Sequence, residues 1–153
     1  MLDDLAERIE KLQAFDNAKE LQDIVDGNLE TYVDLQRQQM IDGKDSDGQD
    51  VLLEGDGYQP ATIEQKQKYG QGYGAITDHV TRYDTGALSQ SLQAQMQGDE
   101  VLIDSPVEYW NDLEARVGPT GTGLDPENRA EFAETVVLPS MAVIMEEKLG
   151  ITL

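Results

Sequence analysis

The stretch HVTRYDTGALSQSL, residues 79–92, decides how the sequence is interpreted, because it joins a long polar segment to a more regular C-terminal part. It contains the only histidine of the chain, together with an arginine, an aspartate, threonines and serines. Such side chains suit an active site, but they equally suit a turn. Asp84 or Thr85 can cap a short helix in which Leu88 and Leu92 pack inward, and the same residues would also suit the start of a strand.

Two helices are predicted before this stretch. Leucine and isoleucine recur at helical spacing in the first segment, so a helix is expected at about residues 2–15. A second helix is expected at about residues 18–41. The triplet DGN at residues 26–28 interrupts its apolar pattern, which predicts a break or kink there.

The part after residue 92 is predicted to hold one or two strands and two helices. EVLIDS, residues 100–105, is the best strand candidate, and residues 107–118 favour a short helix that ends in glycine. In the last helix Asp125 and Pro126 are typical of an N-cap and a first helical position, and Gly150 is typical of the end. Pro139 is expected to break or kink this helix.

The middle segment, from Gly43 to Gly86, has few apolar residues and little periodicity. Residues 51–62 favour a short strand and a turn, and residues 63–74 favour a short helix that runs into glycines. GQGYG, residues 70–74, lacks the lysine of a phosphate-binding loop and is interpreted as a flexible hinge. A segment of this length with so little core is expected to be an extended arm or a partner-binding surface.

These elements predict an α+β fold in which a small antiparallel sheet packs with N-terminal and C-terminal helices. The 153 residues fit a single domain. Its parts are a helical region at residues 1–41, a long extended loop or arm at 43–86, and the sheet with the C-terminal helix at 87–153.

The charge of the chain limits its partners. Asp and Glu number 31 against 11 Lys and Arg, which gives a formal net charge of −20. Such a chain repels nucleic acid and anionic membrane, because phosphate contacts need basic side chains. High solubility, a basic partner, a cation site, a DNA-like surface and a lining along which DNA slides are all compatible with this charge. The absence of cysteine excludes disulfides and thiol catalysis.

A calcium loop is one candidate site. If Gly48 takes the sixth position of such a loop, Asp45, Asp47 and Glu54 fall at ligand positions. The first position would then be Gly43, which has no carboxylate. A turn rich in aspartate is therefore the favoured interpretation.

Catalysis is the other chemical candidate. His79 lies near Asp84, Ser89 and Ser91 in the sequence, but the Gly-x-Ser-x-Gly pattern of a nucleophile elbow is absent. A glycosidase needs two carboxylates in a cleft lined with aromatic rings, and Tyr109-Trp110 is the only aromatic pair that could line one. In a chain with so many acids, this signal is no better than chance. We therefore predict neither an enzyme nor a cofactor or metal.

TRYDTGALSQSL, residues 81–92, resembles a segment shared by small structural proteins of tailed bacteriophages. These are the tail-completion, neck and virion-morphogenesis proteins that join head to tail. Their pattern is formed here by Tyr83, Asp84-Thr85-Gly86, Leu88 and Ser91-Leu92. Three segments lead up to the pattern: LQRQQMIDGKDSDGQDV, YQPATIEQKQKYG and DHVTRYDTG. Three more continue it: EVLIDS, VEYWNDLE and VVLPSMAVIMEEKLG. The resemblance therefore covers residues 35–149. GLDPENRAEF replaces a Gly-rich Arg-Pro-Phe segment of many relatives, which puts the subunit contact there in doubt.

The resemblance implies a homo-oligomeric ring, six- or twelve-fold, in the neck, tail-completion or tail-terminator region of a virion. Its neighbours would be portal-side and tail-tube proteins, and DNA would pass through without specific binding. The chain would be made in the cytoplasm of the host bacterium and would reside at the head–tail interface, with no membrane partner. Asp84-Thr85-Gly86, with Leu88 and Ser91, would be a structural turn and cap. The middle segment would be a partner-contact arm with contact residues Asp45, Asp47, Tyr58, Pro60, Tyr69 and Tyr73.

Two further hypotheses stay open at this point. The first is an acidic DNA mimic that inhibits a DNA-binding protein by occupying its site. The second is a small hydrolase that uses His79 and Asp84.

Overall fold

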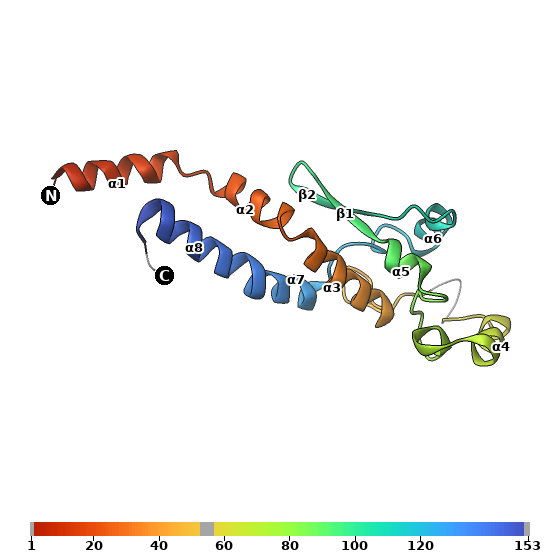
Figure 1. The fold of residues 1–153 in the computed structure, drawn as a ribbon. Coiled ribbons are helices and arrows are strands. Elements are labelled where there is room, and N and C mark those ends of the chain that lie inside the picture. Colours follow the sequence, from red (N-terminus) through yellow and green to blue (C-terminus); the bar gives the residue numbers. More distant parts are fainter. Residues whose placement is uncertain (1, 53–56, 152–153) are drawn as a thin grey trace.

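The computed structural model describes residues 2–52 and 57–151, and it shows an elongated molecule (Figure 1). Helices α1 (Leu2–Ala14), α2 (Asn17–Asp26) and α3 (Leu29–Ile41) follow one another along its length. Helices α7 (Pro126–Phe132) and α8 (Leu138–Leu149) return beside them in the opposite direction. Helix α4 (Pro60–Tyr69) lies at the end far from both termini.

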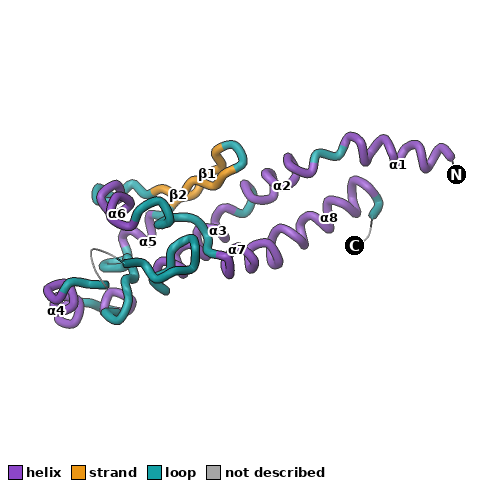
Figure 2. The backbone as a smooth tube through the Cα atoms, turned by 180° about the vertical axis from the view of Figure 1, so that it is seen from behind, coloured by secondary structure: helices purple, strands orange, loops and turns teal. Residues whose placement is uncertain are grey.

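The sheet is a two-stranded antiparallel hairpin beside α3, which confirms the predicted α+β fold (Figure 2). Strand β1 (Gln93–Gln97) pairs with β2 (Glu100–Asp104), so that Gln93 lies opposite Asp104 and Gln97 opposite Glu100. The predicted strand EVLIDS is therefore confirmed as β2. Residues 87–91 form a short helix, α5 (Ala87–Ser91), rather than the start of the strand.

The apolar core lies where α3 meets α5, the hairpin and helix α6 (Trp110–Val117). Six buried side chains form its centre: Val33, Met40, Leu88, Leu92, Ile103 and Trp110. A second contact joins α3 to α7, where the rings of Tyr32 and Phe132 meet edge to face with centroids 5.6 Å apart. The core thus occupies one half of the elongated molecule, and the α1 end lies outside it (Figure 1).

Local signals set the breaks between the N-terminal helices. Asp16 caps α2, because its side chain accepts a hydrogen bond from the Lys19 backbone N–H at 3.0 Å. The predicted break at residues 26–28 separates α2 from α3. The Asn28 amide there donates to the Ile24 carbonyl at 2.8 Å and so satisfies one group at the end of α2.

The C-terminal helix begins at the predicted cap and continues past Pro139. Asp125 accepts a hydrogen bond from the Asn128 backbone N–H at 2.8 Å, and Pro126 is the first helical residue. The predicted break takes the form of a π-turn, Ala133–Val137, which links α7 to α8. Proline lacks an N–H and crowds the carbonyl four residues earlier, which here belongs to Thr135 within this π-turn. No helix within residues 2–52 and 57–151 is long and apolar enough to cross a membrane.

Two glutamines of α3 are buried at the start of α7. The Gln39 amide donates to the Gly123 carbonyl at 2.9 Å, and its oxygen accepts from the Asp125 backbone N–H at 2.7 Å. The Gln36 side-chain oxygen accepts from the Gly123 backbone N–H at 2.7 Å. These bonds fix the loop before α7 on α3, because a buried backbone group without a partner is costly.

The middle segment is more ordered than an extended arm, and the short helix predicted within residues 63–74 is present as part of α4. It contains the ten-residue helix α4 and a 3-10 turn, Gly72–Ala75. Val51 and Leu52 are not part of a strand, so the predicted strand is wrong in the described residues. A bend at residues 57 and 58 agrees with the predicted turn, but Pro60 to Thr62 already belong to α4. The reason is that Pro60 starts a helix well, since its fixed φ suits the first helical position.

Replacement of Gln39 by leucine tests the buried glutamine contact. Gln39→Leu leaves the Gly123 carbonyl and the Asp125 N–H without their partner, so we expect a loss of about 3 kcal/mol in the free energy of unfolding. Urea denaturation followed by circular dichroism measures this. The control is Gln38→Leu, an exposed neighbour that bonds only the Asp42 side chain, for which the expected change is under about 0.5 kcal/mol. Equal losses in both variants would contradict the assignment.

Candidate functional site

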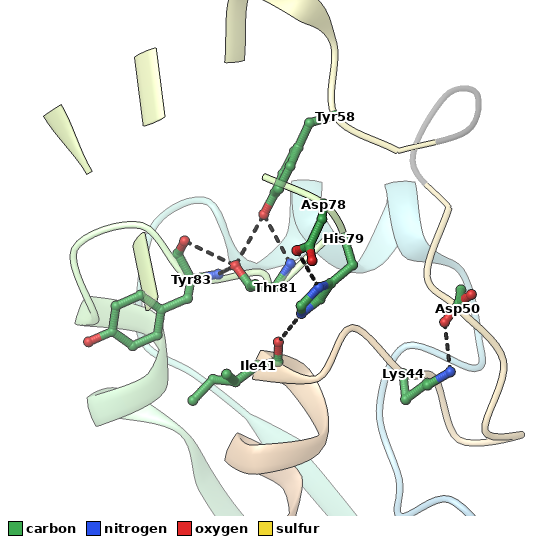
Figure 3. A network of polar contacts seen from close by, with 8 residues as sticks. All are labelled: Ile41, Lys44, Asp50, Tyr58, Asp78, His79, Thr81 and Tyr83. Carbon is green, nitrogen blue, oxygen red and sulfur yellow. Dashed lines mark hydrogen bonds and ion pairs between the residues drawn. The ribbon is translucent and has the colours of Figure 1, made fainter. Parts of the chain in front are cut away.

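Three residues that the sequence singles out, Tyr58, His79 and Tyr83, meet in a polar junction between the middle segment and the end of α3 (Figure 3). We define this junction by Tyr58, Lys66, His79, Thr81 and Tyr83. Thr81 is fully buried at its centre. Its hydroxyl lies 3.2 Å from the Tyr58 hydroxyl and accepts from the Tyr83 backbone N–H at 3.1 Å, and its own N–H donates to the Tyr58 hydroxyl at 3.0 Å. The junction is therefore held by side chains that bond to backbone groups.

His79 ties the junction to the C-terminal end of α3. Its Nε2 lies 2.8 Å from the Ile41 carbonyl oxygen, and its Nδ1 lies 2.8 Å from an Asp78 carboxylate oxygen (Figure 3). The last carbonyls of a helix have no partner within the helix, so the imidazole satisfies one of them. Gly43 follows α3 closely, and a Cβ there would lie 2.8 Å from His79 Cδ2. Glycine at this position therefore allows the histidine to approach.

Lys66 is the buried cation of the junction. Its Nζ donates to the Tyr83 carbonyl at 2.8 Å and to the Gly74 carbonyl at 3.1 Å. It also lies 4.7 Å from the centroid of the Tyr58 ring, which is within the range of a cation–π contact. One side chain of α4 thus holds the 3-10 turn and the start of the motif together.

The glycines of GQGYG are close-packed, which corrects their interpretation as a flexible hinge. A Cβ on Gly70 would lie 2.4 Å from the Lys66 carbonyl oxygen, and one on Gly74 would lie 2.4 Å from the Asp84 carbonyl oxygen. Both values are below any normal van der Waals contact with backbone. Gly70 and Gly74 are therefore required because two backbone segments approach each other there.

The Asp84-Thr85-Gly86 motif forms the turn that starts α5. Gly86 has a φ of +89° and precedes the first residue of α5, and a Cβ on it would lie 2.5 Å from the Tyr83 hydroxyl oxygen. The Thr85 hydroxyl accepts from the Ala87 N–H at 3.4 Å, whereas the Asp84 side chain is exposed. Leu88 is in the core, and the Ser91 hydroxyl lies 2.7 Å from that of Ser105.

The predicted contact residues of the arm fall into two groups. Tyr58 is in the junction, and Asp45 is held by the loop at residues 118–123, because its carboxylate accepts from Thr120 Oγ1 at 3.1 Å. The exposed group comprises Asp47, Pro60, Tyr69 and Tyr73. This second group is the more accessible to a partner, because Asp45 and Tyr58 are half-buried.

The calcium interpretation finds no cluster of ligands in the described residues. Asp45 Oδ1 accepts from the backbone N–H groups of Asp47 and Gln49 at 3.0 and 2.9 Å, as in an aspartate-capped turn. Glu54 lies outside the described residues. Among the residues described, no group of three acidic, histidine or cysteine side chains could hold a metal ion.

The catalytic grouping of His79 with serine is not assembled. Both imidazole nitrogens of His79 face Asp78 and the Ile41 carbonyl, and Ser91 pairs with Ser105. The Ser89 carbonyl accepts a hydrogen bond from Arg37 at 2.6 Å, a further structural role. Of the aromatic pair, Trp110 is buried and Tyr109 is 48% exposed.

Sequence reasoning missed two structural cations, the buried Lys66 and the half-buried Arg82. Arg82 donates to the carbonyls of Lys44 and Gly121 and so joins two loops to the motif. Each cation bonds backbone carbonyls that are distant in the sequence. No local pattern could reveal them, because their partners are set by the tertiary fold.

Comparison with known proteins adds no relative: no protein-family model, no curated protein and no solved structure matches this chain.

Removal of the Lys66 charge tests the junction. Lys66→Met keeps the length of the side chain but leaves the Gly74 and Tyr83 carbonyls without their donor, so we expect a loss of about 2 kcal/mol in unfolding free energy. Hydrogen exchange of the amides at residues 70–83 should accelerate more than that of α3. The matched control is Lys68→Met on the same helix, whose side chain is exposed, with an expected change under about 0.5 kcal/mol. If the two variants unfold alike, the junction does not depend on this cation.

Proposed function

We propose that this chain is a non-enzymatic structural subunit of a tailed-bacteriophage virion. It assembles with copies of itself into a ring at the head–tail interface, in the neck, connector or tail-completion region. DNA passes through the ring, and portal-side or tail-tube proteins lie next to it. The chain is synthesised in the bacterial cytoplasm and carried in the virion.

The observation that carries the proposal is the amount of exposed surface. The chain exposes 10109 Å². A compact monomer of 17.0 kDa is expected to expose about 7,700 Å². The difference, about 2,400 Å², is of the size that subunits of obligate assemblies bury between them. An elongated chain with so much surface and a core in one half is typical of a protein that completes its burial in an assembly.

Two surfaces of different kind lie at opposite ends of the molecule. The helical end carries exposed apolar side chains on α1 and α2, which are Ile9, Leu12 and Leu21, and Val143 of α8 is exposed as well. The α4 end carries the exposed rings of Tyr69 and Tyr73, which are 68% and 48% exposed. Unlike surfaces that pair head to tail generate a ring when the rotation closes. The order of short patterns along residues 35–149 supports the same assignment.

The charge of the chain agrees with DNA passage. With a net charge of −20, a ring of many copies would present a strongly acidic lumen. Phosphate groups are repelled by such a surface, so DNA would slide without being held.

Copy number in the particle tests this function. We expect quantitative mass spectrometry of purified, DNA-filled virions to give a fixed ratio of this chain to the portal protein, near one or near one half for a twelve-fold portal. A chain that is expressed during infection but absent from the particle contradicts the proposal and favours the DNA-mimic inhibitor. A mimic would also bind a DNA-binding protein in competition with DNA, whereas a ring subunit would not.

Self-association tests the helical surface separately. Leu12 is 51% exposed on α1, and Leu12→Asp places a charge on this apolar surface, so we expect the oligomer to dissociate toward monomer. Mass photometry of the purified chain measures the distribution of masses. Gln13→Asp is the control, because Gln13 is an exposed polar neighbour on the same helix. Loss of the oligomer in both variants, or in neither, would show that this surface is not the interface.

A further inference from the structure

A pocket of about 450 Å³ opens between α6, the loop that follows it and the end of α3. This volume lies within the range of about 300–1,000 Å³ that is common for small-ligand sites. Its walls are mostly apolar and include Met40, Trp110, Leu113, Val117 and Gly121, with one cationic side chain, Arg82. The pocket is separate from the polar junction, since its lining shares none of the five junction residues.

Arg82 enters this wall from an uncommon backbone conformation. Its φ is +52°, the only positive φ among the described non-glycine residues. The guanidinium donates through Nη2 to the Lys44 carbonyl at 2.7 Å and through Nη1 to the Gly121 carbonyl. Its Nε is buried and has no hydrogen-bond partner. Two of the three guanidinium nitrogens thus bond backbone carbonyls, and the third, Nε, is enclosed by protein without a partner.

The charge of Arg82 is poorly compensated. Its hydrogen-bond partners in the described residues are carbonyl oxygens, and Asp45 acts on it only through longer-range attraction. Burial is the largest influence and lowers the pKa of Arg82 to about 10, although Asp45 and Tyr58 act in the opposite direction. A guanidinium cannot relieve this by losing its proton at neutral pH, so an anion beside it would be stabilising.

We propose that this pocket binds a carboxylate carried on a hydrocarbon group. The hydrocarbon part lies against Trp110, Leu113 and Val117, and the carboxylate pairs with Arg82. The pocket wall favours a ligand that has both a hydrocarbon part and a carboxylate. A purely apolar ligand would leave the charge of Arg82 uncompensated, and a purely ionic ligand would leave the apolar wall in contact with water. Glu114 also borders the pocket, but it is exposed, so solvent screens its charge. The ligand is either a free organic acid or the terminal carboxylate of an apolar residue in a partner.

The sole tryptophan of the chain makes the site directly observable. Trp110 is 4% exposed and lines the pocket, so its fluorescence reports on the occupant. The probe is 6-bromohexanoate, whose bromine quenches indole on contact. We expect saturable quenching, with binding about tenfold weaker for the uncharged 6-bromohexanamide, as expected when one charge-assisted bond is lost. Equal binding of acid and amide, or quenching that never saturates, would overturn the proposal.

A variant at the pocket mouth keeps the test independent of Arg82, whose replacement would also remove bonds that hold the fold. Ala115 lines the pocket and is exposed on α6, so Ala115→Phe fills the site without disturbing the core. We expect about tenfold weaker binding of 6-bromohexanoate and an unchanged urea midpoint. The control, Asn111→Phe, adds the same ring at an exposed position of α6 that does not line the pocket, and it should bind normally. Undiminished binding in Ala115→Phe would contradict the location.

Competition distinguishes the two sources of the carboxylate. Octanoate represents a free organic acid, and the peptide acetyl-Gly-Gly-Phe with a free terminal carboxylate represents a protein partner. Displacement of 6-bromohexanoate by either compound supports the site, and the stronger competitor identifies the source. The amidated peptide should not compete. Failure of both acids to displace the probe would overturn the proposal.

Discussion

The arrangement of the helices depends on hydrogen bonds from α3 to the loop before α7. Gln39 and Gln36 are buried on a helix that otherwise packs apolar side chains, and both bond to the backbone at Gly123 or Asp125. Because three of their bonds are to peptide groups, they fix where the chain turns back and starts α7, and Gln39 also accepts a hydrogen bond from the Asn128 side chain. The position of α7 against α3 follows from this contact, as does the Tyr32–Phe132 packing beside it.

The middle segment is also held by hydrogen bonds from side chains to backbone groups, but here the side chains are cations. Lys66 and Arg82 donate to backbone carbonyls, although the chain contains 31 acidic residues. A carbonyl already belongs to the fold, whereas an added carboxylate would have to be removed from water as well. The acids can then stay solvated at the surface. The high negative charge is therefore compatible with an ordered interior. The acidic side chains supply the charge at the surface, and cations bonded to backbone carbonyls hold the interior.

Much of the regular structure was predictable, because short-range signals specify it. The break at residues 26–28, the cap at Asp125, the end at Gly150 and strand β2 all follow from local residue preferences or a short apolar run. In the middle segment the short helix was predicted, but the way the segment is held together was not. Its order comes from single polar contacts over long sequence separations, and hydrophobic periodicity carries no information about these. GQGYG illustrates the difficulty: glycines that suggest freedom are there because two backbones nearly touch.

The same limit applies to the candidate site. The motif Asp84-Thr85-Gly86 was identified from sequence order, and the structure places it at a turn beside the junction. The cationic pocket was not identified, because Met40, Arg82 and Trp110 come from distant parts of the chain. A lone arginine between a threonine and a tyrosine gives no signal of its burial. Only the fold brings it beside an apolar wall.

The π-turn before α8 has a geometric consequence for how the two rows of helices fit. One extra residue in a helical turn rotates everything after it by about 100° around the helix axis. The turn lies against α2, the middle helix of the opposite row. The N-terminal row is broken on both sides of α2, and the π-turn of the other row faces this same helix. Phe132 can face α3 while Leu149, more than three turns later, is still buried at the α1–α2 end.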